Sequence, residues 1–366
     1  MKMLAGLRVL EISDGLVDFG GRMLAELGAD VVSVTPESEE PGTRALAWHH
    51  GKTRLVADSP DAIANLAKAA DIVIDGQREG DRFGLDRHLR EDGRTIHIRA
   101  KPFSEGGPYD GRPATDLTLM ALSGLMTVTG DPDKPPLRFP GEQAYALAGI
   151  QAAIAALIGL YARRRTGQGQ SISLSALQSA TLANYREAIM YEWTGRIGRR
   201  QGNLLVRGKS GVRQVWPCRD GHVTWSMIDN PPMMRALVSV MAEKGVAGEL
   251  TDIDWDNTLV ADTAQETLDR WQAIVGEFFS AHDKSELGAW SLEKGWGLSV
   301  ISTPADVLAS DHLAARGLFV DVQDQASGKT RRLPGPLFLS DRDMDAPRRR
   351  LDQPIPASAF AGWSQR

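Results

Sequence analysis

Cysteine is almost absent from this chain. Cys218 is the only one among 366 residues, so no disulfide can form within the chain, and no Cys or His lies near it at the spacing of a structural zinc site. We expect no metal site and assign Cys218 to packing.

An excess of positive charge is also lacking. The 42 basic and 47 acidic side chains give a net charge of −5, which argues against a nucleic-acid partner.

Long unbroken apolar runs are missing as well. The stretch 144–162 is the most apolar and contains Gln151, whereas a membrane span needs about 20 nearly unbroken apolar residues. It therefore predicts a buried helix and no membrane partner. The first residues pass directly into a strand pattern, without the apolar core and cleavage site of a signal peptide. We expect a cytoplasmic protein.

Alternating secondary-structure signals fill the first hundred residues. Residues 7–36 have the pattern of a strand, a turn with glycines, an amphipathic helix and a second strand. Further apolar strands are expected at 71–75 and 95–99. Strands alternating with helices predict a mainly parallel sheet with right-handed crossovers. The predicted class is α/β.

Three glycines in the first turn raise the question of a dinucleotide site. Gly15, Gly20 and Gly21 do not have the spacing of G-x-G-x-x-G, and no acidic residue ends the second strand to hold a ribose hydroxyl. A nicotinamide-dependent dehydrogenase is therefore not expected.

The remainder of the chain predicts helices first and then a mixed region. Long helices are expected at 144–165 and 175–194, separated by the glycine-containing turn 166–170. Asp220 and Gly221 form a good hairpin turn within the strand-like stretch 202–226. This stretch begins a smaller α+β domain, with later elements expected at 232–244, 264–280, 298–302 and 319–339.

Short motifs along nearly the whole chain resemble the class III CoA-transferases, the superfamily of formyl-CoA transferase, carnitine CoA-transferase and α-methylacyl-CoA racemase. Each motif alone is weak, but they occur in family order from residue 4 to about residue 338. They are residues 4–13 with 24–32, Gly51-Lys52, 104–109, Asp116 with 120–130, 163–170, Gly202-Asn203, 217–221, 303–308, 315–317 and 333–336.

The resemblance implies a fold and an assembly. It implies a large Rossmann-like domain whose first part is 1–200, a small α+β domain at 201–300, and a return to the large domain at 301–366. It also implies an interlocked dimer, in which two subunits thread through each other. The partner is either a homologous class III subunit or a second copy of the chain.

The residue that carries the family chemistry is not in its place. In members that transfer CoA, an aspartate attacks the donor thioester, and the reaction passes through a mixed anhydride and an enzyme thioester. The family places this aspartate twenty-one residues before the threonine of the Thr-Gly-x-Gly-Gln turn, here Thr166, which leads to Tyr145. Gly149 supports this register. A phenol with a pKa near 10 is a poor nucleophile at neutral pH, so we do not expect Tyr145 to react.

Two other groups could rescue the chemistry. Glu142 could act as a displaced nucleophile, although a carboxylate in the first turn of a helix is more simply explained by the helix dipole. Asp116 could take part, but a helix cap at the start of 117–126 is the simpler interpretation. The racemase branch places a histidine before the equivalent of Asp116, and here that position is Thr115, so two-base proton exchange is not expected.

Coenzyme A binding has mixed support. Lys52, Arg78 and Lys101 match positions where the family keeps basic residues near the nucleotide, and positive charges there would face the CoA phosphates. Ser33 and Thr35 replace the family's usual basic and acidic residues. We expect no tightly bound cofactor, with CoA and acyl-CoA as substrates.

Three functions follow from the resemblance. The first is transfer of CoA between an acyl-CoA and a carboxylic acid, with this chain as the aspartate-lacking subunit of a heteromeric enzyme. The second is an active homodimeric CoA-transferase that uses Glu142. The third is a non-enzymatic acyl-CoA-binding or interaction protein on the same fold.

Overall fold

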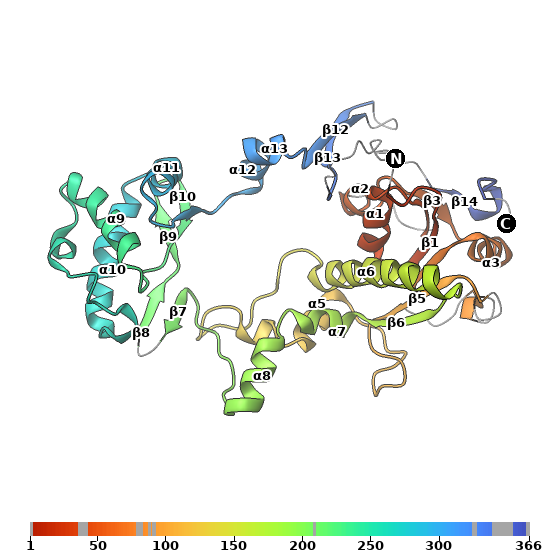
Figure 1. Ribbon diagram of the computed structural model, residues 1–366, viewed down its shortest axis with the longest axis horizontal. Coiled ribbons are helices and arrows are strands. Elements are labelled where there is room, and N and C mark those ends of the chain that lie inside the picture. The colour runs from red at the N-terminus through yellow and green to blue at the C-terminus, as the bar shows by residue number, and fades with distance from the viewer. Residues whose placement is uncertain are drawn as a thin grey trace. The chain divides into compact units, whose positions relative to one another are not determined.

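The protein divides into two compact units. The computed structural model describes residues 3–35, 43–77, 83–86, 89, 93–207, 210–323, 328–338 and 354–363. Unit 1 comprises Met1–Thr127, Leu137–Gly198 and Asp311–Arg366, and unit 2 comprises Val128–Pro136 and Arg199–Ser310 (Figure 1). The domain boundaries expected from the sequence stay a prediction.

Unit 1 is built on a parallel sheet, which confirms the expected α/β class. In the part of the chain that the structure describes, seven strands pair in the order β14-β3-β2-β1-β4-β5-β6, and every pairing is parallel. The strands are β1 (Arg8–Ser13), β2 (Asp30–Thr35), β3 (Thr53–Val56), β4 (Ile72–Gly76), β5 (Ile96–Lys101), β6 (Ser171–Ser175) and β14 (Ile355–Pro356). The chain leaves β1 toward one edge through β2 and β3 and toward the other through β4, so the topological switch point lies between β1 and β4.

Alternate residues of the strands supply two apolar layers, as the pleat requires. Val9, Val31, Ile72 and Ile98 belong to the core that also contains α1 (Asp18–Glu26) and α6 (Gln143–Thr166). Their neighbours in the strands, including Leu10, Val32 and Val73, belong to a second core with α3 (Pro60–Ala69). The sheet is therefore covered on both faces near its centre.

The helix α6 is the longest element and crosses α1 at close range (Figure 1). A Cβ added at Gly149 would lie 2.9 Å from the Gly20 nitrogen, and one at Gly20 would lie 2.6 Å from the Gly149 carbonyl oxygen. By length and composition α6 could cross a membrane, but half of its most apolar stretch is buried inside the protein. Its contacts with α1 and β5 are those of a core helix.

Smaller elements complete unit 1. They are α2 (Thr43–Trp48), α5 (Asp116–Leu122), η1 (Met126–Val128, which ends in unit 2), α7 (Ala176–Leu182), α8 (Tyr185–Thr194), α13 (Asp311–Ala315), β12 (Phe319–Gln323), β13 (Thr330–Pro334) and η4 (Ala357–Ala359). The expected helix 175–194 is wrong as one piece, because α7 ends at Leu182 and α8 begins at Tyr185. Asn184 stands at the N-cap position of α8 without a side-chain capping bond, and its side-chain amide donates to the Ser123 carbonyl. Residues 171–175, ahead of that helix, form the edge strand β6.

Unit 2 has a core rich in aromatic rings. Trp216, Trp225 and Phe279 pack edge to face or tilted, with centroids 5.6–6.1 Å apart. Its elements are β7 (Leu204–Arg207), β8 (Ser210–Arg213), β9 (Val215–Cys218), β10 (Gly221–Thr224), α9 (Pro231–Glu243), η2 (Gly248–Asp252), η3 (Val260–Asp262), α10 (Gln265–Ser280), α11 (Lys284–Lys294), β11 (Ser299–Val300) and α12 (Pro304–Ala309). The β9–β10 hairpin was predicted, but its two-residue turn is Arg219–Asp220, one residue before the predicted Asp220–Gly221, because Gly221 already pairs with Cys218.

Candidate functional site

The carboxyl end of β1 faces the beginnings of two helices. Ser13 Oγ, at the end of β1, accepts hydrogen bonds from the backbone of Gly15 and Val17, each at 3.2 Å. These bonds close the turn that leads into α1 at Asp18. Because α1 and α6 cross closely at Gly20 and Gly149, the first turn of α6 lies beside this loop. Residues from both helices therefore meet at one packed junction, which we call the α6 crevice.

Tyr145 fills the inner part of the α6 crevice. It lies in the first turn of α6 and is only 4% exposed. Its hydroxyl donates a hydrogen bond to the Ala114 carbonyl oxygen at 3.2 Å, and its ring belongs to the main core of unit 1. The phenol is thus packed and hydrogen-bonded as a core residue.

Asp116 caps α6. Its Oδ1 accepts a hydrogen bond from the Tyr145 amide at 3.1 Å, and burial raises its pKa although the Tyr145 and Ala144 amides favour the charged form. The cap of α5 is Thr115, whose hydroxyl accepts from the Thr118 amide. The expectation that Asp116 caps the 117–126 segment is therefore wrong, because its side chain turns to the neighbouring helix instead.

Glu142 is held by an arginine from a distant part of the sequence. It is the N-cap residue of α6, and its Oε2 lies 2.5 Å from Arg44 Nε. Arg44 NH1 lies 3.1 Å from Asp18 Oδ2, and Arg44 NH2 donates to the Gly15 carbonyl at 2.9 Å. Arg44 thereby ties the β1–α1 loop, the start of α1 and the start of α6 together.

Behind Arg44 lies a buried polar cluster, which consists of Glu11, Asp18, Ser33, His49 and Lys52. His49 Nε2 lies 3.2 Å from Asp18 Oδ2, and both side chains are 1% exposed. Burial opposes ionisation of Asp18, but the close approach of His49 and the charges of Lys52 and Arg44 outweigh it and hold its pKa well below the usual range. At Glu11 burial is the stronger effect, and it raises the pKa although the charge of Lys52 beside it acts to lower it.

Lys52 belongs to this cluster. Its Nζ donates to Glu11 Oε1 at 2.5 Å and to the Asp18 carbonyl at 2.6 Å, and its side chain is fully buried. Ser33 donates to the same Glu11 oxygen. In this chain the Lys52 ammonium compensates a buried carboxylate, and its assignment to CoA phosphates stays a prediction.

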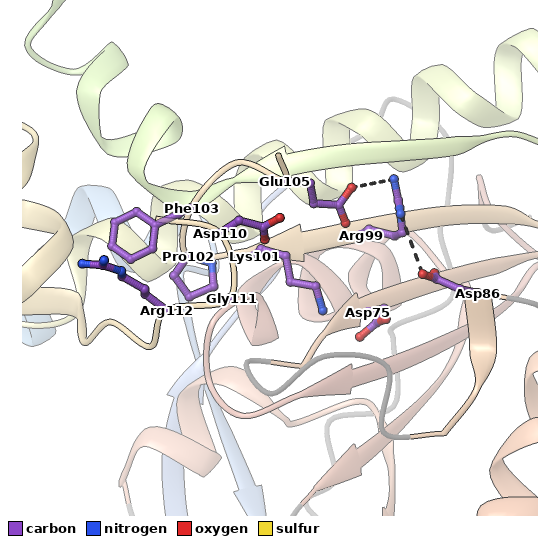
Figure 2. A pocket seen from close by; sticks show the side chains of 10 residues that line it. All are labelled: Asp75, Asp86, Arg99, Lys101, Pro102, Phe103, Glu105, Asp110, Gly111 and Arg112. Carbon is purple, nitrogen blue, oxygen red and sulfur yellow. Dashed lines mark ion pairs between the residues drawn. The ribbon is translucent and has the colours of Figure 1, made fainter. Parts of the chain in front are cut away.

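Lys101 lines a cavity of about 260 Å³ at the carboxyl ends of β4 and β5 (Figure 2). Its Nζ donates to the Gln77 carbonyl at 2.9 Å. Arg99 pairs with Glu105 at 2.7 Å and with Asp86 at 3.8 Å, and Figure 2 shows these pairs on one wall of the cavity. Arg78, the third predicted CoA-binding residue, lies outside the described residues.

The floor of the cavity is acidic. Asp75 is buried, and His97 Nε2 lies 3.7 Å from its Oδ2. Burial disfavours the charged form of Asp75, but the nearby His97, the charge of Lys101 and the hydrogen bonds that Asp75 accepts from Gln77 outweigh this and lower its pKa. Lys101 therefore lies between a compensating carboxylate and the open space of the cavity.

Arg44 was missed by the sequence-based reasoning. It contacts Glu142, which is 98 positions away in the chain, and no local spacing announces such a pair. The sequence did contain one sign of a polar cluster near Arg44, since Asp18, Arg22 and Glu26 follow one another at intervals of four on α1. All three are buried in the structure. A buried charged stripe on a helix requires partners from neighbouring elements.

The similarity of the chain to known proteins extends over almost its whole length. The family model described as CoA-transferase family III matches residues 4–354. The BbsE subunit of succinyl-CoA:(R)-benzylsuccinate CoA-transferase from Thauera aromatica is 27% identical over 343 residues, which cover 84% of this chain and 81% of that protein. Succinate–glutarate CoA-transferase from Agrobacterium fabrum is 28% identical over 386 residues, covering 96% and 92%.

A solved structure has the same fold. The crystal structure of a CaiB/BaiF family protein from Brucella suis matches with a TM-score of 0.80 and 25% identity, covering 94% of this chain and 95% of that one. Family model, relatives and fold agree, and the chain belongs to CoA-transferase family III.

Proposed function

We propose that this chain is the nucleophile-lacking subunit of a heteromeric CoA-transferase, which transfers CoA between an acyl-CoA and a carboxylic acid. The observation that carries the proposal is Tyr145, a buried and hydrogen-bonded phenol at the position where the family resemblance expects the reacting aspartate. In the heteromer, a homologous chain supplies that aspartate. The name of one relative, a CoA-transferase subunit, is consistent with such an assembly.

The chemistry of transfer explains why Tyr145 cannot replace the aspartate. An attacking group must form an anhydride and then a thioester, and only a carboxylate can do both. The Tyr145 hydroxyl donates a hydrogen bond to the Ala114 carbonyl oxygen, which holds the phenol in the core. This environment supports a packing role.

The cavity of Figure 2 supports retention of CoA binding. It lies at the carboxyl ends of parallel strands, where open α/β sheets bind ligands. Lys101 lies on its wall and could neutralise a CoA phosphate, and the Phe103 and Tyr109 rings, with centroids 5.3 Å apart, offer apolar surface nearby. The acidic groups Asp75 and Glu105 would disfavour phosphates placed deep in the cavity.

Unit 1 has exposed apolar surface that a second family chain would cover. None of the ten residues of α8, all within the described ranges, is buried, and Trp193 is 84% exposed. Other large apolar side chains on the outer sides of α6 to α8 are Ile158, Tyr161, Leu182, Tyr185 and Ile189. Exposed patches of this kind mark protein interfaces, and the proposed occupant is the aspartate-bearing homologous chain.

Co-expression tests the proposal directly. A tagged version of this chain should co-purify with a class III chain from the same genome that carries the aspartate, and only the mixed complex should transfer CoA from succinyl-CoA to an acceptor acid. Replacing the partner's aspartate by asparagine should abolish transfer, whereas Tyr145→Phe in this chain should not. Robust transfer by a homodimer of this chain alone would contradict the proposal.

The alternative nucleophile Glu142 can be tested in the same preparation. Its Oε2 already accepts from Arg44, so this oxygen is engaged and less available for attack on a thioester. With acyl-CoA as donor, we expect no hydroxylamine-sensitive adduct on this chain. An adduct that disappears in Glu142→Gln would favour the homodimeric enzyme instead.

A further inference from the structure

We propose that residues 354–363, near the end of the chain, form a releasable strap that caps the edge strand β3. When the strap is released, β3 becomes an association edge for a second copy of the chain. The strap contacts β3, α3 and the first residues of β1 and β2. These contacts lie outside the α6 crevice and the Lys101 cavity, so the proposal is separate from CoA transfer.

The strap closes one edge of the sheet in unit 1. β14 pairs with β3 in parallel, Ile355 with Leu55 and Pro356 with Val56, and η4 follows beside α3 (Figure 1). On its other side β3 pairs with β2. Without β14, β3 would be the outermost described strand on this side, with a row of backbone N–H and C=O groups open to another chain.

The ladder between β14 and β3 is weak. It is two residue pairs long, against four pairs between β2 and β3. Pro354 and Pro356 have no backbone N–H, so Ile355 carries the only amide donor of residues 354–356. Prolines in an edge strand also hinder the addition of a further strand. β14 therefore blocks growth of the sheet while few backbone bonds hold β14 itself.

Two polar contacts fasten the strap. The Ser358 amide donates to Asp58 Oδ1 at 3.0 Å, and the Ser358 hydroxyl donates to Asp58 Oδ2. These hydrogen bonds lower the pKa of Asp58, so the carboxylate is charged at neutral pH. Trp363 Nε1 donates to Asp30 Oδ2 at 2.8 Å. Both contacts are exposed, and water can take the place of the strap when it lifts.

The apolar contacts of the strap are shallow. Ala357 is its one buried residue, whereas Ile355 is 42% exposed. Phe360 and Trp363 are partly buried against the second core, and the Arg8 guanidinium lies 5.9 Å from the centre of the Trp363 ring. Few buried apolar contacts and exposed hydrogen bonds are typical of segments that open locally while the rest of the protein stays folded.

Release of the strap exposes two kinds of surface together. These are the edge of β3 and the apolar surface beneath Phe360 and Trp363. An open strand edge is a template for another strand, and an apolar patch beside it favours association. Each copy of the chain offers the same edge, and a two-fold axis would pair the two β3 strands antiparallel. The partner that this surface fits is therefore a second copy with its strap released.

Hydrogen exchange followed by mass spectrometry on the purified full-length chain tests local release. The amides of 357–363 should exchange about a hundredfold faster than those of β1. Trp363→Ala should speed exchange in the strap and in β3 about tenfold more and leave β1 unchanged, and Ser358→Ala should act in the same direction. Ser239→Ala is the matched control, because Ser239 also donates to a carboxylate, that of Glu243 in unit 2, and it should change neither.

Sedimentation velocity tests the association edge. A chain that ends at residue 353 should form larger, concentration-dependent species than the full-length chain, and a synthetic peptide of residues 354–366 should reverse this. The same peptide with Trp363→Ala should need about a tenfold higher concentration. Circular dichroism checks that the truncated chain folds. If it does not fold, full-length Trp363→Ala takes its place and should also associate more than the wild type.

Three results would overturn the proposal. The first is exchange in the strap at the same rate as in β1, because the strap would then open only when the whole protein unfolds. The second is a rise in exchange that is equal in the strap, β3 and β1 of Trp363→Ala. The third is a folded truncated chain that sediments as the full-length chain does, or whose association the peptide does not reverse.

Discussion

The α6 crevice and the Lys101 cavity lie in the same unit and differ in how completely they are filled. In the crevice, Tyr145 packs into the core and Arg44, Asp18 and Glu142 pair with one another. At the ends of β4 and β5, about 260 Å³ remain open beside Lys101. Both places are positioned by parallel strands and the loops that follow them.

The difference separates the reaction from the binding of its substrate. A site that must form a covalent intermediate needs an accessible nucleophile, and the crevice offers a packed phenol. A site that only holds part of a substrate needs open space and a few polar groups, and the cavity offers these. This contrast supports a chain that has kept substrate contacts without transfer chemistry.

Truncation of Tyr145 in the α6 crevice should give the largest loss in the free energy of unfolding. Tyr145→Ala removes a buried aromatic ring and leaves a hole in the core, so the free energy of unfolding should fall by about 3–5 kcal/mol. Urea denaturation followed by circular dichroism, at fixed protein concentration, measures this.

Tyr145→Phe is the matched control. It keeps the ring and loses only the hydrogen bond to Ala114, so it should cost about 1 kcal/mol. If Tyr145→Ala costs no more than Tyr145→Phe, the crevice is open in solution and the contrast with the cavity fails.

A substitution at the crossing of α1 and α6 should give the next largest loss of stability. In Gly149→Ala the new methyl group would lie 2.9 Å from the Gly20 nitrogen and 3.0 Å from Phe19 Cβ. The helices must separate, and we expect a loss of about 1–3 kcal/mol in the same denaturation experiment, despite the better helix propensity of alanine.

Gly276 in α10 is the control for that substitution. An added Cβ there meets only the Trp216 ring at 3.4 Å, an ordinary contact. Gly276→Ala should be neutral or stabilising by up to about 1 kcal/mol. Equal losses for the two variants would show that the close crossing does not hold the crevice together.

The cap of α6 gives a smaller effect. Asp116→Ala removes the acceptor of the Tyr145 amide and should lower the free energy of unfolding by about 1 kcal/mol. Asp116→Asn keeps an acceptor oxygen and should lose less. The same urea denaturation experiment measures both variants. If Asp116→Ala is as stable as the wild type, water replaces the carboxylate as the acceptor of the Tyr145 amide, and the α6 crevice admits more water than its packing suggests.

Local pattern was sufficient for the elements that carry strong periodicity. The first strand–helix–strand unit, the strands at 71–75 and 95–99 and the hairpin at Asp220 were all predicted, because buried strands and tight turns leave marks within a few residues. The edge strand β6 was not predicted, although Ser171, Ser173 and Ser175 alternate with apolar residues in the manner of a half-exposed strand.

Contacts between distant residues could not be predicted in the same way. The count from Thr166 identified Tyr145, but no local rule shows that its hydroxyl meets Ala114, or that Glu142 meets Arg44 across 98 positions. The resemblance assigned Lys52 to the CoA phosphates, and that assignment stays a prediction. Its burial beside Glu11, a charged residue in the middle of an apolar strand, was not predicted.

The smallest expected effect on stability belongs to the open region. Lys101→Met keeps most of the side-chain length and removes a charge at a half-exposed position, so the free energy of unfolding should change by no more than about 0.5 kcal/mol. Affinity for CoA, measured by calorimetry on the chain or its complex, should fall about tenfold, because the charge facing a phosphate is lost. Lys134→Met, which removes an exposed lysine paired with Asp131 in unit 2, should leave CoA affinity unchanged. If Lys101→Met binds CoA normally but unfolds more easily, the contrast between the α6 crevice and the Lys101 cavity fails. Lys101 would then be a structural residue, like Lys52 beside Glu11, and not a substrate contact.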